Sequence, residues 1–159
     1  MTENYLEMMG DSLQKKIRIL QELERISLQQ KELFAQGDAM DDDVFDAAVD
    51  RKGELIDELD RLDDGFVSLF EKVKAQIGDD KKPYAAQITG IQEQIRTISA
   101  LSAAIEAQEM RNKMMADRYF EKAREELHKG KQTSQVAFSY YKNMNHFSNI
   151  PPQFFDGKK

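Results

Sequence analysis

The chain contains no cysteine and no tryptophan, and it has only 3 prolines and 8 glycines among 159 residues. The absence of cysteine excludes a disulfide framework and thiol catalysis, and it suits a reducing compartment. The scarcity of proline and glycine leaves few breaks, so the secondary-structure elements are expected to be long. No apolar run approaches the roughly 20 residues that a membrane-spanning helix needs, which argues against membrane insertion.

The first residues, Met1-Thr-Glu-Asn4, carry neither the basic region nor the apolar region of a secretory signal. Charged residues make up 33% of the chain and hydrophobic residues 40%, a balance typical of elongated helices that each bury one stripe. We therefore expect one soluble, cytoplasmic, helical domain.

Charge is divided unevenly along the chain, whose net charge is −6. Residues 41–77 hold 12 acidic and 5 basic side chains, whereas residues 129–159 hold 5 basic and 1 acidic side chain. An acidic protein without a basic face repels phosphate backbones, so no nucleic-acid partner is expected. The basic end is suited to docking on an acidic surface, including the acidic segment of the same chain.

Apolar residues recur at steps of three and four along three segments, which predicts helices over about 4–36, 42–77 and 83–129. The first stripe comprises Leu6, Met9, Leu13, Ile17, Leu20, Leu23, Ile26, Leu33 and Phe34. The second comprises Phe45, Ala48, Leu55, Leu59, Leu62, Phe66, Leu69, Val73 and Ile77, and the third Tyr84, Ile88, Ile91, Ile95, Ile98, Leu101 and Ile105. From Leu55 to Val73 the spacing alternates between four and three, as in a coiled-coil seam. The predicted fold class is all-α: an elongated antiparallel three-helix bundle or coiled coil in residues 1–129.

Residues at the predicted boundaries agree with this interpretation. Gly37 stands where glycine ends helices, and Asp41-Asp42-Asp43 places carboxylates at the start of the second helix. Pro83 stands where proline is favoured, at the first position of the third helix. That helix would reach roughly 70 Å against roughly 52 Å for the others, at 1.5 Å per residue. We therefore expect it to outrun its neighbours after about Met115–Tyr119, leaving Tyr119, Phe120 and Leu127 uncovered.

No catalytic constellation is recognisable. The histidines, His128 and His146, have no ligand spacing, and no serine has a histidine close by in the sequence to act as its base. The aspartates near residue 41 lack the alternating ligands, central glycine and closing glutamate of a calcium loop, so helix capping is the preferred interpretation. We expect no enzyme, no cofactor and no metal site.

The last thirty residues, 130–159, hold an unusual share of the aromatic side chains. Of 9 phenylalanines and 5 tyrosines in the chain, Phe138, Tyr140, Tyr141, Phe147, Phe154 and Phe155 lie here. A short helix is predicted over 134–147, ended by Pro151-Pro152. Ordering about 20 such residues costs on the order of 20–30 kcal/mol, which burial of roughly 1,000 Å² of apolar surface would offset. The tail is therefore poised between packing on its own bundle and covering a partner.

Methionine is the second unusual feature, because three of the 8 methionines lie near the predicted overhang. Methionine is common where a surface adapts to a partner, although a gap-filling core role is equally compatible. Aromatic side chains dominate interface energetics. The predicted partner-binding residues are Met110, Met114, Met115, Tyr119, Phe120, Leu127, Val136, Phe138, Tyr140, Tyr141, Met144 and Phe147.

The chain resembles flagellar export chaperones of the FlgN type and the related FliT-like family. The resemblance rests on the run Asp50-Arg-Lys-Gly-Glu-Leu-Ile-Asp-Glu-Leu-Asp60, on the tyrosine-containing Ser139-Tyr-Tyr-Lys142, and on the terminal Phe154-Phe-Asp-Gly-Lys-Lys159. It implies a type III secretion chaperone that binds the C-terminal helices of hook-associated export substrates and delivers them to the export gate. It also implies that Tyr140 and Tyr141, or less strongly Tyr119, contact the gate.

The alternative function, from another class, is a structural coiled-coil scaffold or adaptor whose heptads mediate homo- or hetero-oligomerisation. The two hypotheses differ in their partners. The chaperone requires an export substrate and a gate component, whereas the scaffold requires copies of itself or another coiled coil. A homodimer is compatible with either.

Overall fold

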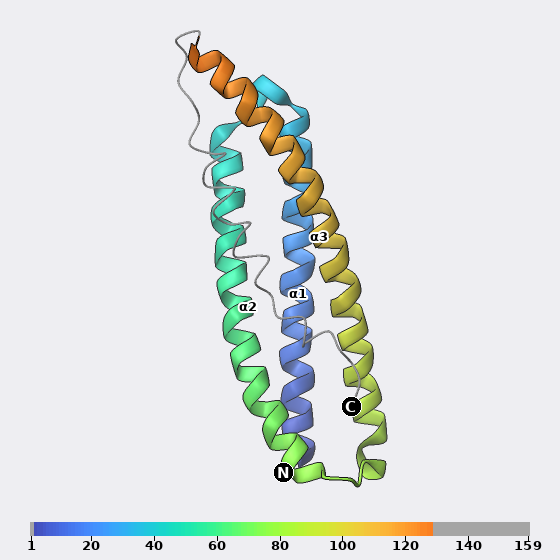
Figure 1. The fold of residues 1–159 in the computed structure, drawn as a ribbon. Helices are drawn as coiled ribbons and strands as arrows, with labels where there is room; N and C mark the ends of the chain where they lie inside the picture. Colours follow the sequence, from blue (N-terminus) through green and yellow to red (C-terminus); the bar gives the residue numbers. More distant parts are fainter. Residues whose placement is uncertain (1, 129–159) are drawn as a thin grey trace.

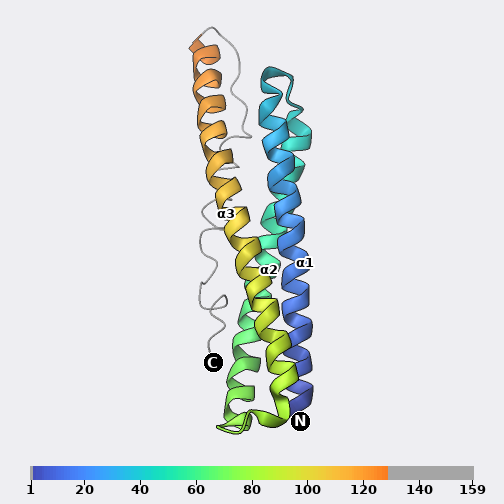
Figure 2. The same ribbon diagram turned by 90° about the vertical axis from the view of Figure 1, so that its right-hand side faces the viewer.

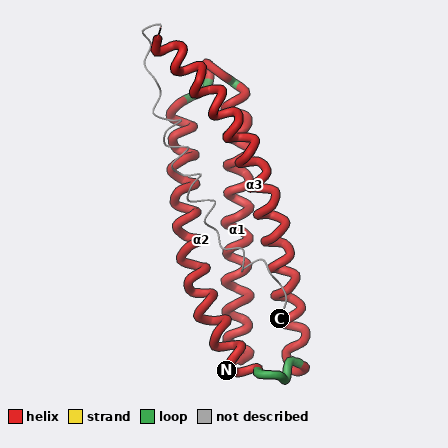
Figure 3. The backbone as a smooth tube through the Cα atoms, viewed as in Figure 1, coloured by secondary structure: helices red, strands yellow, loops and turns green. Residues whose placement is uncertain are grey.

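The computed structural model describes residues 2–128 of the chain. These residues form three α-helices, α1 (Thr2–Ala35), α2 (Asp42–Ile77) and α3 (Ala85–His128), and two 3-10 helices, η1 (Gly37–Ala39) and η2 (Lys82–Tyr84). The helices run up, down and up, and short connections join them at the two ends of the bundle (Figures 1 and 3). The predicted all-α bundle is confirmed. The predicted tail, with its helix over 134–147, lies outside the described residues.

The helix boundaries follow from local chemistry. The Asp41 side chain caps α2, because its Oδ1 accepts hydrogen bonds from the backbone N–H groups of Asp43 and Val44 at 3.0 and 3.3 Å. Gly37 and Gly78 take φ angles of 57° and 58° after α1 and α2, a region that glycine enters without a Cβ penalty. Pro83 lies within η2, so the prediction that it opens the third long helix was wrong by one short turn.

The central helix is α1, which packs against both α2 and α3 (Figure 1). The predicted stripe of α1 is buried throughout, and α2 contributes buried Leu55, Leu59, Phe66 and Val73. From α3, Ile98 and Ile105 are fully buried, whereas Ile88, Ile91 and Ile95 below them are half-buried. The core is therefore a long seam along α1, thinner where α3 begins.

A second apolar cluster closes the end of the bundle near the α1–α2 connection. Its buried members are Leu33, Phe34, Met40, Phe45, Val49 and Ala116, and Met115 and Tyr119 pack against it. The Phe34 ring lies 5.1 Å from that of Phe45 in an edge-on arrangement and 6.2 Å from that of Tyr119. We call this group the end cluster.

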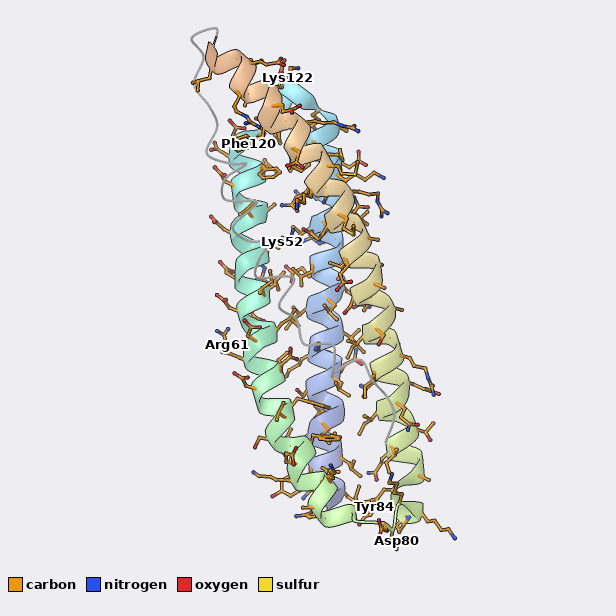
Figure 4. The ribbon with its side chains drawn as sticks, viewed as in Figure 1. Lys52, Arg61, Asp80, Tyr84, Phe120 and Lys122 are labelled. Atoms are coloured by element: carbon orange, nitrogen blue, oxygen red, sulfur yellow. The ribbon has the colours of Figure 1, made fainter. Side chains whose placement is uncertain are left out.

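The end cluster corrects the predicted start of the overhang. Tyr119 and Phe120 are each half-buried, not uncovered. An exposed ion pair between Lys122 Nζ and Asp38 Oδ2, at 3.2 Å, shows that α3 still lies beside the α1–α2 connection one turn further on (Figure 4). Only then does α3 project past its neighbours (Figure 2), and Leu127 is 52% exposed as expected.

Candidate functional site

Six of the predicted partner-binding residues lie on α3, and the structure divides them between two faces. Met110 and Met114 are the most exposed large apolar side chains described, at 70% and 59%. Four residues apart, they share one face, and at 100° per residue that face points away from buried Ala116. Met115 and Tyr119 instead pack on the end cluster. Only the first pair forms an open apolar patch.

Phe120 and Leu127 continue the inward-facing stripe of α3. They lie seven residues apart, close to two helical turns, so they share a side of the helix. The Arg124 guanidinium lies 5.3 Å from the centre of the Phe120 ring. Leu127 is exposed, and it belongs to the end of α3 that projects past the other two helices (Figure 2). The other predicted residues, Val136, Phe138, Tyr140, Tyr141, Met144 and Phe147, lie outside the described residues.

A buried polar layer, absent from the sequence-based predictions, joins all three helices below the end cluster. Lys52 Nζ of α2 donates to Glu109 Oε1 of α3 at 2.5 Å and to Gln30 Oε1 of α1 at 3.2 Å. Ser27 Oγ of α1 donates to the same Glu109 oxygen at 2.6 Å. All four side chains are buried. The layer fixes α3 against both other helices at one height.

The polar layer extends one further turn along α3. Asn112 Nδ2 donates to the backbone oxygen of Ser27 at 2.8 Å, and Gln108 Nε2 donates to Asn112 Oδ1 at 2.8 Å. Arg111 in turn donates to Gln108 Oε1 at 2.8 Å. Polar groups in a low-dielectric interior are costly unless paired, so such a network favours one register of α3 over sliding along α1.

The sequence held a signal for this layer. Lys52 occupies the seam position between Ala48 and Leu55, at the four-three spacing of α2, and Glu109 and Asn112 continue the four-three spacing of α3 after Ile105. Judged by apolar residues alone, the stripe weakens at these positions. A polar residue at a seam position in each helix predicts a buried polar layer instead.

A second buried ion pair joins α1 to α2 nearer the other end, where Lys16 Nζ contacts Asp63 Oδ1 at 2.8 Å. Burial lowers the pKa of Lys16 and raises the pKa of Asp63, even though each faces an opposite charge. Burial likewise lowers the pKa of Lys52 despite Glu109. For these groups desolvation outweighs the attraction, which marks both pairs as costly to bury.

A shallow open depression of about 390 Å³ lies between α1 and α2. Its lining is Lys15, Arg18 and Ile19 of α1 with Glu58, Arg61 and Leu62 of α2. We call it the basic groove. It depends on how α1 and α2 are aligned, which the sequence alone does not reveal.

Comparison of the chain with protein-family models, curated proteins and solved structures gives no match. The resemblance to flagellar export chaperones therefore stays a prediction. Within residues 2–128, no three His, Cys, Asp or Glu side chains are grouped so that they could hold a metal ion. None of the helices described is both long and apolar enough to cross a membrane.

Proposed function

We propose that this protein is a cytoplasmic type III (flagellar) secretion chaperone. It binds the C-terminal helical region of hook-associated export substrates and delivers them to the export gate. Binding is hydrophobic and stoichiometric, and it uses α3 together with residues 130–159. The observation that carries the proposal is the exposed apolar surface of α3, at Met110 and Met114 within the bundle and at Leu127 near the end of the helix.

An amphipathic helix presents residues at steps of three and four to a hydrophobic groove or helix face. The exposed Met110 and Met114 offer a flexible apolar surface of that kind, one turn apart on α3. Leu127 offers a second contact beyond the bundle. Because these two surfaces lie on different faces of α3, we assign Met110 and Met114 to substrate capture, and Leu127 with the aromatic tail to a second contact such as the gate.

The burial of the α2 seam favours the chaperone over the scaffold. A homo-oligomeric coiled coil through α2 needs its seam on the surface, yet Leu55 and Leu59 are buried against α1, as is Val73. Among the large apolar side chains described on α2, only Val44 and Val67 are exposed. Two valines at that separation form no continuous heptad stripe.

The test measures binding of a synthetic peptide covering the C-terminal helix of a hook-associated protein, by calorimetry with the full chain. Met110→Glu with Met114→Glu is expected to weaken binding at least about tenfold, because two charges would be desolvated in an apolar contact. Met8→Glu with Leu28→Glu is the matched control, since both residues are exposed apolar positions on α1.

Tyr140→Ala with Tyr141→Ala is expected to leave the helical content unchanged and to abolish pull-down of the cytoplasmic part of the export gate. Sedimentation of each variant separates the alternative function, because a scaffold forms a constitutive oligomer that depends on α2. Equal peptide binding by wild type and both α3 and α1 variants would contradict substrate capture on α3.

A further inference from the structure

The face of α3 that is turned away from α1 carries a second row of apolar side chains. Its members recur at steps of three and four, and all are exposed: Ala100, Ala103, Ala107, Met110 and Met114. The buried row of α3, which includes Ile98, Ile105 and Ala116, lies about half a turn away at 100° per residue. No described helix lies beyond this side of α3 in Figure 1, and the same side faces the viewer in Figure 2. We call this row the outer seam.

The spacing of the outer seam is that of a coiled coil, in which side chains of one helix pack between those of another. Large and small side chains fit best when they face each other across such a seam. The two sizes are separated along the outer seam, because its alanines precede residue 108 and its methionines follow it. A helix that runs in the opposite direction, with methionines opposite these alanines, therefore has the matching shape. A second copy of α3 is such a helix.

We propose that the outer seam is the interface of an antiparallel dimer, in which α3 of a second copy packs against it. The register that sets Ala107 opposite the partner's Met110 also sets Ala103 opposite the partner's Met114. A twofold axis repeats both contacts, since such an interface uses the same patch on both copies. Each of these layers then places one small side chain against one large side chain.

Charge complementarity supports this register. Arg96 and Glu121 continue the outer seam at its two ends, and Arg96 faces the partner's Glu121. Beside the seam, Glu106 and the partner's Lys113 lie on the same side of the interface and about 3 Å apart along the helix axis. The twofold axis makes two of each contact. All four side chains are exposed, and none makes an ion pair with another described residue.

The other charges on this part of α3 are compatible with the pairing. Asp117 lies in the seam between Met114 and Glu121, one turn from the partner's Arg96. Arg111 donates to buried Gln108 at 2.8 Å, and the two copies of Arg111 are about 7.5 Å apart along the axis. The exposed charged residues from 96 to 121 are 3 acidic, Glu106, Asp117 and Glu121, and 4 basic, Arg96, Arg111, Lys113 and Arg118. This face is therefore nearly neutral in a chain whose net charge is −6. A parallel pairing is disfavoured, because it sets Arg96, Asp117 and Glu121 each against its own copy.

The second copy would cover Met110 and Met114, which are also the residues assigned to substrate capture. A second copy and an export-substrate helix would therefore compete for the outer seam, a consequence that rests on the proposed function. The dimer itself does not rest on it. Dimerisation would keep the most exposed large apolar side chains described from meeting other proteins until a substrate displaces the second copy.

The experiment follows the mass of the full chain by analytical ultracentrifugation over a range of concentrations. We expect a dimer with a dissociation constant on the order of 10 µM, because an alanine-rich seam buries less surface than a standard interface. Ala103→Glu with Ala107→Glu is expected to weaken the dimer at least about tenfold, since it desolvates charges in the seam. Ala47→Glu with Ala75→Glu is the matched control, because both are exposed alanines of α2. Circular dichroism checks that each variant keeps its helices.

Exchanging charges tests the register. Glu106→Lys alone and Lys113→Glu alone are each expected to weaken the dimer at least about threefold, because like charges then face each other. A mixture of the two variants is expected to dimerise as well as wild type, since each lysine then faces a glutamate of the partner. Equal weakness of the mixture would overturn the register.

Cysteine cross-linking tests the direction of the helices, and the chain has no cysteine of its own. Ala103→Cys mixed with Met114→Cys is expected to form a disulfide-linked dimer. Ala103→Cys alone is not, because the antiparallel register separates its two copies by about 16 Å along the axis, too far for a disulfide. Cross-linking of Ala103→Cys alone would indicate a parallel pairing and overturn the proposal.

A wild-type chain that stays monomeric at about 200 µM would overturn the proposal, as would equal losses in the seam variant and its control. A monomer in which the Ala103→Cys thiol resists alkylation would assign the face to residues 129–159 instead. The export-substrate peptide separates this proposal from the proposed function. A dimer that binds no peptide contradicts only the proposed function, and a monomer that binds peptide contradicts only the dimer. If both hold, the peptide is expected to convert the dimer into a complex with one copy of the chain.

Discussion

The two buried ion pairs of this bundle differ in how many side chains take part in their hydrogen bonds. Glu109 Oε1 accepts from both Lys52 and Ser27, and Lys52 reaches Gln30 as well. Asp63 accepts from Lys16 alone through Oδ1, and its buried Oδ2 has no hydrogen-bond partner among the described residues. The first pair belongs to a network across three helices, whereas the ion pair of Lys16 with Asp63 joins two helices.

The two pairs therefore contribute differently to the fold. A desolvated pair rarely stabilises a fold by itself, because the cost of burying two charges cancels most of the attraction. A network can still specify one arrangement, since every other register leaves several groups unpaired. We infer that Lys52–Glu109 sets the register of α3, which carries the proposed substrate surface. Lys16–Asp63 is the more replaceable pair.

The largest expected effect comes from Glu109→Ala, which leaves the Lys52 ammonium buried without its carboxylate. We expect a loss of about 3–5 kcal/mol in the free energy of unfolding. Urea titration followed by circular dichroism measures it. The matched control, Glu106→Ala, removes an exposed glutamate one turn earlier on α3 and is expected to change little. A loss of stability equal to that of the control would show that the buried Lys52 ammonium does not need Glu109 as its counter-ion.

Asp63→Ala is expected to cost less, towards the lower end of about 3–5 kcal/mol, because it leaves the buried Lys16 ammonium without its carboxylate but, unlike Glu109→Ala, leaves no second donor such as Ser27 Oγ without its acceptor. The same urea titration, with Asp64→Ala at the adjacent exposed position as control, measures the loss. If Asp63→Ala proved as costly as Glu109→Ala, the distinction between the network and the Lys16–Asp63 pair would be wrong.

Replacing both partners of each pair by apolar residues separates the cost of burying the charges from the role of the network. Lys16→Met with Asp63→Leu removes two desolvated charges and the unpaired Asp63 oxygen, so we expect a gain of about 1–2 kcal/mol in the free energy of unfolding. Lys52→Met with Glu109→Leu is expected to gain less, because Ser27 Oγ loses its acceptor. Hydrogen exchange of α3 amides is expected to rise only in the second double variant. The reverse order of stabilities would contradict a specifying role for the network.

The sequence predicted the helices well because their stripes bury the apolar residues that define them. The apolar residues from Leu6 to Ile26 on α1 and from Leu55 to Val73 on α2 repeat at the helical period. The Asp41 cap was predictable from its residue type alone. The predicted start of the overhang was wrong because it was derived from the lengths of the helices alone. Those lengths do not include the α1–α2 connection, where Met40 and Phe45 belong to a cluster that Tyr119 packs against.

The candidate sites were only partly predictable, for reasons of geometry. Met110 and Met114 were predicted to bind a partner because they lie near the expected overhang, but their exposure and their separation from the Tyr119 face depend on the orientation of α3. To predict the polar layer, one must know that seam positions of three helices meet at one height. To predict the basic groove, one must know how α1 is aligned with α2, because Arg18 and Arg61 are far apart in the sequence.

The smallest expected effect comes from a surface ion pair, which completes the comparison. Arg51 donates to Glu22 at 2.9 and 3.1 Å and to Glu54 at 3.1 Å, with all three side chains partly or largely exposed. The Arg51 hydrogen bonds hold the pKa of Glu22 below its ordinary value of 4.5. Because the folded pKa is lowered, this stabilisation is present above pH 4.5 and lost as pH falls through the lowered value.

Glu22→Gln is therefore expected to lose, at pH 7, less than about a fifth of the stability lost by Glu109→Ala, since water screens exposed pairs. The difference between variant and wild type should shrink towards zero as pH falls below 4.5. Urea titrations at pH 7 and at successively lower pH measure it, with Glu24→Gln as control, because Glu24 has no ion pair among the described residues. A loss that does not change with pH would mean that Glu22 stabilises the fold through packing. The Glu22–Arg51 pair would then say nothing about how much a surface ion pair contributes to stability.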